Sequence, residues 1–361
     1  MQMIDRSYGD RLIQATFKIE EKEDDLRLDQ FVKLFLKSHG RNEVKRKIQN
    51  KECFVTNRVS ANKASSRLKI GDEVKIMIHQ STHEDEYWRG ELLDLLKPTV
   101  SFEDDDLIVC NKPAFMSTHP TGRHLFNCAT VFYEKERNLK TVHSVHRLDR
   151  ETSGILLLAK NPKTANALTT EFENSNVKKC YLWISRKLSH AKSSKWTASE
   201  NLGSIYEGRK RVIVSAFEEG SEFGKKALTD FEVLFENNEY AVGLAFPKTG
   251  RTHQIRVHAA VHGHPLIGDK LYLGGYPMFQ RFKDMISTED DCDKLELPRH
   301  ALHAYGIQIN YQKESRFFTC NLTEDLQDFI KEKLHLDIDT FSRKASLASK
   351  RYFNLIKIQK S

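Results

Sequence analysis

The features that this sequence lacks limit where the protein can work. No apolar run approaches the ~20 residues that a membrane-spanning helix needs, and residues 1–25 contain no apolar core typical of a secretion signal. No C-x-x-C pair occurs, so neither a zinc finger nor a disulfide framework is indicated. The cysteines are scattered at Cys53, Cys110, Cys128, Cys180, Cys292 and Cys320. We therefore expect a cytoplasmic protein with reduced, buried thiols and no membrane partner.

Several cofactor signatures are also missing. A G-x-x-x-x-G-K-[ST] loop, which binds nucleoside triphosphates, does not occur, and the P-C-x-x-C pattern of zinc deaminases is absent. His253, His258, His262 and His264 lie close together in the sequence, but without the glutamate of an H-E-x-x-H motif or a nearby cysteine. We expect no metal and no cofactor, and assign these histidines to ligand contact or packing.

Charge is unevenly distributed along the 361 residues, a length that favours two domains. Residues 26–78 hold thirteen Lys and Arg against five Asp and Glu, a surplus of eight positive charges. Residues 84–106 hold two against nine, a deficit of seven. The basic segment is a candidate footprint for a polyanion, although a charged solubilising surface would have the same composition.

Hydrophobic patterning predicts a small module followed by a larger domain. Residues 26–49 contain two stretches with helical spacing, the second with Lys45, Arg46 and Lys47 on its surface, and alternation at 74–78 predicts a strand. Further on, apolar strand-like runs recur with one clear helix at 161–175, capped by Asn161. Many strands without regular βαβ alternation favour an α+β fold with a mostly antiparallel central sheet.

The basic module resembles an S4 RNA-binding domain. The resemblance rests on "RLDQFV", the basic second helix and "LKIGDEVKI". It implies a small α/β domain that holds structured RNA through phosphates, with Lys45, Arg46 and Lys47 among the RNA-binding residues. The expected organisation is an N-terminal extension at 1–25, the S4-like domain at 26–80, an acidic linker at 81–98, a catalytic domain at 99–335 and a basic C-terminal tail at 336–361.

The larger domain resembles the pseudouridine synthases of the RluA type. Motifs occur in the family's order: "NKPAF", "HRLDRETSG", "KKCY", "KKALTDFEVL", "KTGRTHQIRVH", "GHPLIGDKLY" and "RHALHAYGIQI". "NKPAF" departs from the family by carrying Phe115 where a glycine is usual. The resemblance covers about two-thirds of the chain, and it implies the pseudouridine synthase fold, with a basic catalytic cleft that accepts a uridine flipped out of RNA.

The resemblance assigns roles to individual residues. Asp149 matches the essential aspartate, which either attacks C1′ of the ribose or removes a sugar proton, and Arg256 matches its basic partner. Tyr181 matches the tyrosine that stacks on the base, and its hydroxyl is a second candidate for proton removal from C5. Arg147 is associated with the substrate and the flipped nucleotide. Arg251 and His253, in the motif that contains Arg256, complete the expected RNA-binding residues.

We therefore expect an RNA pseudouridine synthase, monomeric by default, that acts on large-subunit ribosomal RNA. Transfer RNA is the alternative substrate, because "STHPTGRH" (117–124) resembles a loop of members that modify tRNA. A non-catalytic RNA-binding or ribosome-assembly factor is a second alternative, although such a factor would be expected to lose Asp149 or Tyr181. A glycoside hydrolase would need a second carboxylate, for which Glu151 is the near candidate.

Overall fold

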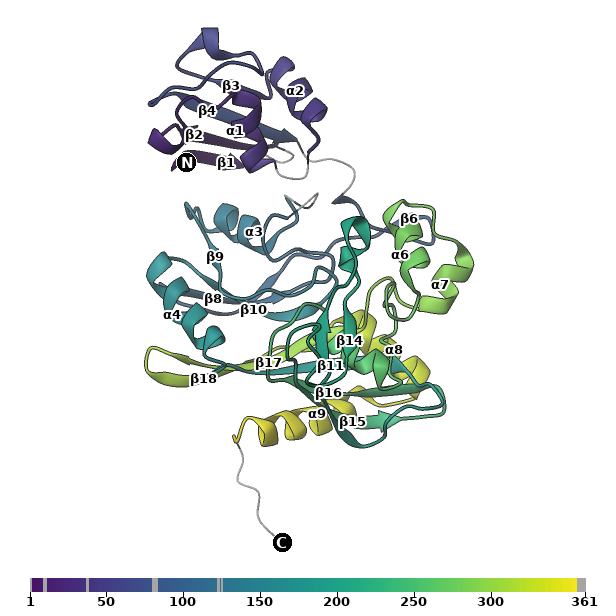
Figure 1. The fold of residues 1–361 in the computed structure, drawn as a ribbon. Helices are drawn as coiled ribbons and strands as arrows, with labels where there is room; N and C mark the ends of the chain where they lie inside the picture. The colour runs from purple at the N-terminus through teal and green to yellow at the C-terminus, as the bar shows by residue number, and fades with distance from the viewer. Residues whose placement is uncertain are drawn as a thin grey trace. The chain divides into compact units, whose positions relative to one another are not determined.

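A computed structural model describes residues 2–8, 12–36, 39–79, 84–121, 124 and 126–355. The chain forms two compact units (Figure 1). Unit 1 comprises residues 1–85 and 119–141, and unit 2 comprises residues 86–118 and 142–361. Five of the six cysteines are buried, and all six are free thiols. None of the described helices is long and apolar enough to cross a membrane.

Unit 1 is a four-stranded antiparallel sheet with helices packed on it. Its strand order is β1-β2-β4-β3. Alternate residues of β2 and β4 are buried, as expected for strands with one face on a core. The regular elements are β1 (Gln2–Tyr8), β2 (Leu12–Lys18), η1 (Glu21–Glu23), α1 (Leu28–Phe35), α2 (Arg41–Gln49), β3 (Cys53–Val55), η2 (Val59–Ala61), β4 (Glu73–His79) and α3 (Ala129–Glu136).

Two features of unit 1 differ from the expected organisation. β2 pairs with β4 and β1 pairs with β2, so residues 2–8 and 12–18 belong to the sheet rather than to an extension that ends before residue 26. Residues 119–141 also belong to this unit, because Cys128 and Val131 pack into the same core as α1 and α2. The expected catalytic range of 99–335 is therefore interrupted. Both differences arise from pairings distant in sequence, which local patterns do not report.

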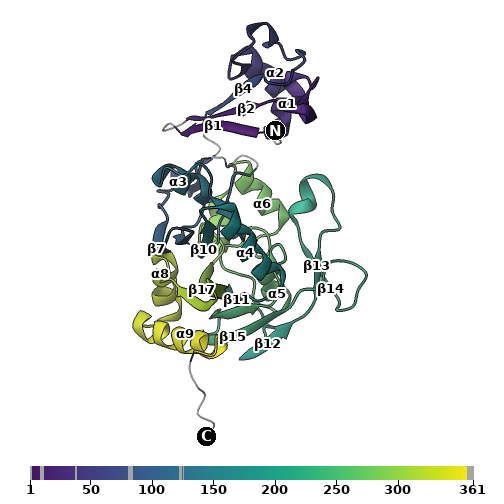
Figure 2. The same cartoon turned by 90° about the vertical axis from the view of Figure 1, so that its left-hand side faces the viewer.

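Unit 2 is built on a ten-stranded sheet whose main strand order is β12-β15-β16-β11-β17-β10-β8-β7 (Figures 1 and 2). Neighbouring strands are antiparallel except β10 and β17, which confirms the expected mostly antiparallel sheet. The strands are β5 (Tyr87–Trp88), β6 (Glu91–Leu92), β7 (Thr99–Glu103), β8 (Leu107–Lys112), β9 (His143–Ser144), β10 (Ser153–Ala159), β11 (Lys178–Arg186), β12 (Lys195–Ala198), β13 (Asn201–Gly203), β14 (Ser215–Phe217), β15 (Thr229–Glu236), β16 (Tyr240–Pro247), β17 (Leu302–Tyr311) and β18 (Glu314–Thr319).

Helices cover both faces of the central strands in unit 2. They are α4 (Pro162–Glu173), η4 (Gly208–Val212), α5 (Gln254–Val261), α6 (Tyr276–Lys283), α7 (Glu289–Leu295), α8 (Glu324–Leu334) and α9 (Ile338–Tyr352). Asn161 caps α4 by accepting a hydrogen bond from the Thr164 backbone N–H at 2.9 Å, which confirms the predicted cap.

Strand alternation decides which side chains reach the site. In β16, Val242 and Leu244 face α8 and α9, whereas Ala241 and Ala245 face α5. The same period of two in β11 places Tyr181 on the α5 side of the sheet.

The ends of the expected catalytic domain also differ from the structure. The expected tail at 336–361 begins with α9, whose Phe341 and Ala345 are buried against the sheet; residues 356–361 lie outside the described part. Of the expected acidic linker, residues 81–83 lie outside the described part. From residue 86 on, the linker belongs to unit 2, where Trp88 stacks on Phe282 with ring centroids 6.0 Å apart.

Candidate active site

Asp149 lies in the turn that leads from β9 into β10. The Thr152 backbone N–H donates to the Asp149 carbonyl at 3.0 Å, which closes the turn. β10 then pairs with β8 on one side and β17 on the other, so the turn is attached to the middle of the sheet. A further contact fixes the turn: Thr152 Oγ1 lies 2.8 Å from His300 Nε2. The sequence therefore places a short polar turn on a rigid support.

Gly154 is required by the backbone at the start of β10. Its φ is +111°, and an added Cβ would lie 2.3 Å from the Ala304 carbonyl oxygen of β17. We predict that Gly154→Ala lowers the free energy of unfolding by about 2–4 kcal/mol, from backbone strain and forced separation of the strands. Thermal or urea unfolding measures it. Gly40→Ala is the control, because an added Cβ there meets nothing within 4 Å. Equal stability of the two variants would contradict the packing argument.

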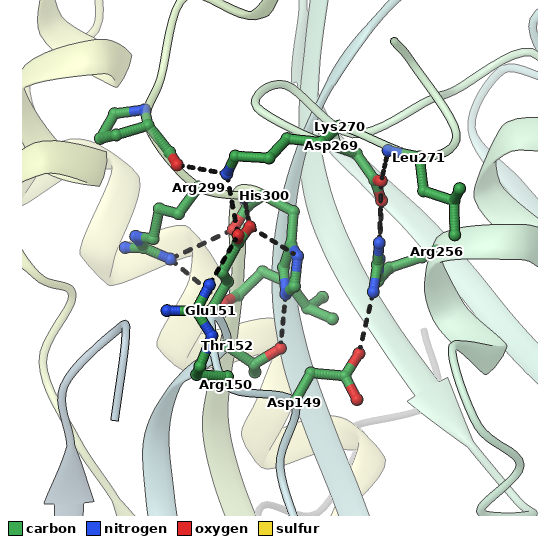
Figure 3. A network of polar contacts seen from close by, with 12 residues as sticks. Asp149, Arg150, Glu151, Thr152, Arg256, Asp269, Lys270, Leu271, Arg299 and His300 are labelled. Atoms are coloured by element: carbon green, nitrogen blue, oxygen red, sulfur yellow. Dashed lines mark hydrogen bonds and ion pairs between the residues drawn. The ribbon is translucent and has the colours of Figure 1, made fainter. Parts of the chain in front are cut away.

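Arg256 binds two carboxylates at once (Figure 3). Its Nε and Nη2 donate to Asp269 at 2.7 and 2.9 Å, and its Nη1 donates to Asp149 at 3.2 Å. Asp269 is completely buried and also accepts the backbone N–H groups of Leu271 and Tyr272, both at 3.0 Å. Asp269 thus fixes the plane of the guanidinium, and the remaining nitrogen points to Asp149. This bidentate geometry is specific to arginine.

The charges around Asp149 keep it ionised. Burial would raise the pKa of Asp149, but the surrounding positive charge outweighs burial and lowers its pKa to about 2. His253, 4.0 Å away, contributes only when protonated, and burial together with Arg256 lowers the His253 pKa to about 4. The guanidinium of Arg256 is therefore the charge that acts on Asp149 at neutral pH. The Asp149 side chain is 26% exposed, so this anion is accessible to a ligand.

A cavity of about 140 Å³ opens beside Asp149. Among its lining residues are Arg147, Asp149, Tyr181, Arg251, His253 and Arg256. An engineered cavity of roughly 150 Å³ accepts benzene, so this volume suits one six-membered ring. The six residues selected in this domain from the sequence therefore meet at one place.

Tyr181 contributes an aromatic ring and a protonated hydroxyl to the cavity. Burial and the nearby Asp149 carboxylate raise the pKa of Tyr181 above its usual range. The phenol therefore holds its proton at neutral pH, which favours the ring-stacking role over a role as a base.

Lys179 is a lining residue that the sequence did not single out. Its Nζ donates to the Thr249 carbonyl at 3.3 Å, and burial lowers the pKa of Lys179 to about 8. It also lines a second cavity of about 440 Å³, together with Arg147, Arg251 and Lys248. The quoted "KKCY" motif contained this lysine, but alternation in β11 did not distinguish it from a surface residue.

The other carboxylates near Asp149 are kept ionised by basic partners, so they are not suited to act as general acids. Glu151 Oε1 accepts from Lys270 Nζ at 2.8 Å, and Glu151 Oε2 accepts from the His300 backbone N–H at 3.2 Å (Figure 3). Burial would raise the pKa of Glu151, but Lys270 and His300 bring it well below its usual value. Asp269 is likewise held ionised by Arg256, since its lowered pKa reflects that pairing against the cost of burial. A glycoside hydrolase needs a protonated acid, and neither carboxylate suits that role.

The histidine cluster is occupied by protein contacts. His258 Nδ1 lies 3.0 Å from Thr229 Oγ1, and its Nε2 lies 3.1 Å from the Glu200 carbonyl. His264 contacts Ser185 Oγ at 3.0 Å and the Lys192 carbonyl at 2.6 Å. Among the described residues no group of three or more His, Cys, Asp and Glu side chains could hold a metal ion. These two imidazoles therefore serve packing.

Lys45, Arg46 and Lys47 lie on α2 in unit 1 and do not line the cavity. Lys47 forms an ion pair with Glu52 at 2.7 Å. Arg46 is exposed and Lys45 is half-buried, so these two are the better candidates for an RNA contact.

Known proteins are similar to this chain in sequence and in fold. The family profile described as RNA pseudouridylate synthase matches residues 106–261. An "Uncharacterized RNA pseudouridine synthase" of Chlorobaculum parvum is 31% identical, over 86% of this chain and 95% of its own. A "Ribosomal large subunit pseudouridine synthase C" of Pasteurella multocida is 30% identical, over 85% and 89% of the two chains.

A solved structure, "Human RNA Pseudouridylate Synthase Domain Containing 4", has a TM-score of 0.51 at 21% identity, over 64% of this chain and 91% of that one, and so shows the fold. The protein is thus an isomerase that acts on RNA. It belongs to the RNA pseudouridine synthase family.

Proposed function

We propose that this enzyme converts specific uridines of large-subunit ribosomal RNA to pseudouridine, with Asp149 as the catalytic carboxylate. The observation that carries the proposal is the 3.2 Å contact from Arg256 to Asp149 at the wall of a cavity that also contains Tyr181. The substrate assignment rests on relatives named as ribosomal large subunit synthases C and D, the latter 30% identical in Blochmanniella floridana. The protein would act in the cytoplasm as a monomer, without metal or cofactor.

The proposed chemistry follows from the charges in the cavity. Isomerisation breaks the bond from N1 to C1′, turns the base and joins C5 to C1′; C5 loses its proton and N1 takes one up, so the composition is unchanged. A carboxylate held as an anion can attack the electron-poor C1′ or remove a sugar proton, and both routes stay open. The Tyr181 ring would support the detached base without fixed hydrogen bonds, which would hinder its rotation. Arg147, exposed at the cavity, would contact the flipped nucleotide.

A map of pseudouridines in total RNA tests the substrate. Carbodiimide labelling followed by primer extension, with and without the gene, should show sites that are lost from large-subunit ribosomal RNA. Loss confined to transfer RNA would favour the tRNA alternative instead. The tRNA alternative rests on the loop at 117–124, of which residues 122 and 123 lie outside the described residues.

We further propose that unit 1 contains an S4-like RNA-binding module centred on α1, α2 and the β3–β4 pair. We predict that Lys45→Ser/Arg46→Ser weakens RNA affinity and lowers the slope of log affinity against log salt by about 1.4–1.8, because two phosphate contacts are lost. Filter binding across a salt series measures both, and kcat at saturating RNA should stay within about twofold.

The matched control for this module is Lys18→Ser/Lys22→Ser, which removes the same charge from exposed positions. Identical salt slopes in the two double variants would contradict the S4 assignment. Point variants are preferable to deletion of residues 1–80, since that deletion would expose Cys128, Val131 and their neighbours in the shared core.

A further inference from the structure

Lys179 is a half-buried cation at the wall of the cavity that contains Asp149. Its Nζ donates to the Thr249 carbonyl at 3.3 Å, which is a neutral partner. Burial lowers the pKa of Lys179 to about 8, and no carboxylate of the described residues offsets that burial. A cation removed from water without an opposite charge costs free energy, so this side chain is a candidate for a functional role.

Strand β11 presents Lys179 and Tyr181 on the same side of the sheet. Side chains two apart in a strand share a face, and Tyr181 lies on the α5 side. Both residues line the cavity of about 140 Å³ together with Asp149. The Thr249 carbonyl, just beyond the neighbouring strand β16, holds the ammonium in place. A six-membered ring in this cavity would therefore have the Tyr181 phenol and the Lys179 ammonium along one wall.

The other charged and titratable groups at Lys179 come from the turn before β10, from α4, from β11 and from the segment after β16. They are His146, Arg147, Asp149, Glu173, Tyr181, Lys248, Arg251, His253 and Arg256, which line this cavity or the adjoining one of about 440 Å³. Burial, and then the charge of Lys179, lower the pKa of His146 to about 3, and the pKa of His253 is about 4. Both imidazoles are therefore neutral at pH 7. Of the groups in this described set whose pKa is shifted, Lys179 alone has a pKa near 8.

The proposed reaction creates a second negative charge in the cavity, besides that of Asp149. When the N1–C1′ bond breaks, its electron pair leaves with the uracil on either route open to Asp149, and the uracil anion shares its charge among N1, O2 and O4. The charge disappears when C5 joins C1′, C5 loses its proton and N1 takes one up. Arg256 is engaged by two carboxylates, so it offers little free positive charge to the ring. A further cation in the cavity would stabilise the transition state of bond breaking.

We propose that Lys179 is a catalytic residue whose ammonium binds a carbonyl oxygen of the departing uracil and stabilises it as an anion. The inference rests on the proposed function, because it takes the cavity to be the place that receives the uridine. Asp149 then acts on the sugar, Tyr181 supports the face of the ring, and Lys179 neutralises the charge that develops on the ring.

The charge test compares Lys179→Met with Lys179→Arg in single-turnover labelling of a ribosomal RNA transcript. Lys179→Met should lower the rate by about 10²-fold, whereas Lys179→Arg keeps the charge and should stay within about tenfold of wild type. Lys178→Met is the matched control, because Lys178 is the neighbouring residue on the opposite face of β11 and lines neither cavity. Equal rates in Lys179→Met and Lys178→Met would overturn the proposal.

The pH dependence of kcat/KM tests the protonation state. The ammonium is the active form, so the wild-type value should fall as pH rises through about 8, the pKa of Lys179. Lys179→Arg should remove this decline, because arginine stays charged, and Lys178→Met should keep it. A wild-type value that rises through pH 8 would mean that the neutral amine acts as a base, and would overturn the proposal.

RNA affinity distinguishes the uracil anion from a phosphate group. Arg147 and Arg251 line the larger cavity with Lys179, so a phosphate is the other anion to consider. The uracil anion exists only during the reaction, so Lys179→Met should bind RNA within about twofold of wild type and with an unchanged salt slope. A salt slope reduced by about 0.7–0.9 would indicate a lost phosphate contact and would contradict the proposal.

A binding measurement without turnover separates this inference from the proposed function. Barbiturate is a six-membered ring anion at pH 7, and uracil is its neutral counterpart. Ligand-observed NMR should show that wild type and Lys178→Met bind barbiturate about tenfold or more tightly than uracil, and that Lys179→Met loses this preference. Equal affinities in the wild type, or no binding of barbiturate, would overturn the inference.

The combined outcomes show which proposal fails. If the wild type leaves RNA unmodified but prefers barbiturate through Lys179, the proposed function fails and the anion site stands. If the wild type modifies RNA and Lys179→Met reacts and binds like wild type, only the role of Lys179 fails. Urea unfolding of Lys179→Met should match wild type, because the substitution removes a charge that burial disfavours.

Discussion

Asp149→Asn is expected to abolish pseudouridine formation, with kcat reduced by about 10⁴-fold or more. An amide has nearly the same shape and can still accept a hydrogen bond from Arg256, but it cannot supply the negative charge that attacks C1′ or removes a proton. Because Asp269 still pairs with Arg256 in the variant, the fold should persist. Carbodiimide labelling and primer extension on ribosomal RNA measure the loss.

The control for this variant is Asp105→Asn, which removes the same charge from an exposed loop residue outside the cavity. It should label RNA as wild type does. Asp149→Asn protein should also bind RNA with an affinity within about tenfold of wild type, because phosphate contacts supply most of the binding. Wild-type labelling by Asp149→Asn would refute the proposed catalytic role, whatever its RNA affinity.

Arg256→Met is expected to have the second largest effect, because it acts on stability and on catalysis together. Removal of the guanidinium leaves the Asp269 carboxylate buried without its partner, which costs about 3–5 kcal/mol of unfolding free energy. Activity should fall by about 10²- to 10³-fold at neutral pH, as positioned charge is lost at the carboxylate. Urea unfolding and single-turnover labelling measure the two effects.

The pH profile distinguishes the catalytic effect from the structural one. In the wild type the pKa of Asp149 is about 2, so Asp149 is protonated only when pH falls through that value. Without Arg256 the charge and the hydrogen bond that it supplies are lost, so the pKa of Asp149 rises and the residual activity should disappear at a higher pH than in the wild type. A profile parallel to wild type would show that Arg256 acts on stability alone.

Arg299→Met is the matched control. Arg299 is as buried as Arg256 and binds Asp325 through Nε and Nη2 at 2.7 and 3.0 Å, without touching Asp149. Its loss should destabilise the protein by less than the loss of Arg256, because the Asp325 side chain is 36% exposed, and should leave the acid side of the pH profile in place.

The sequence predicted the parts of the site that lie in short motifs. Asp149, Tyr181 and Arg256 come from three separate stretches, and the sheet brings them to one cavity. The central strands were also predictable, since β10, β11 and β16 each contain an apolar run. A buried strand with both faces covered leaves this signal in local composition.

Supporting contacts were harder to foresee. From the sequence alone Asp269 is an ordinary loop residue. In the structure it accepts two hydrogen bonds from Arg256, which fix the guanidinium beside Asp149. Tyr272 reads as an ordinary aromatic residue, although its hydroxyl connects Val214 to His253. Such roles depend on partners that are distant in sequence, and no periodicity reports them.

The interrupted sequence of unit 1 has a consequence for synthesis on the ribosome. Its core needs Cys128 and Val131, which are translated well after Ile78, the last core residue of the first segment. At about 5–20 residues per second, the intervening stretch of roughly 50 residues takes on the order of 3–10 s. During that interval the apolar surface of the nascent N-terminal segment is exposed to solvent. We therefore expect chaperones to bind this enzyme mainly through the first third of its chain.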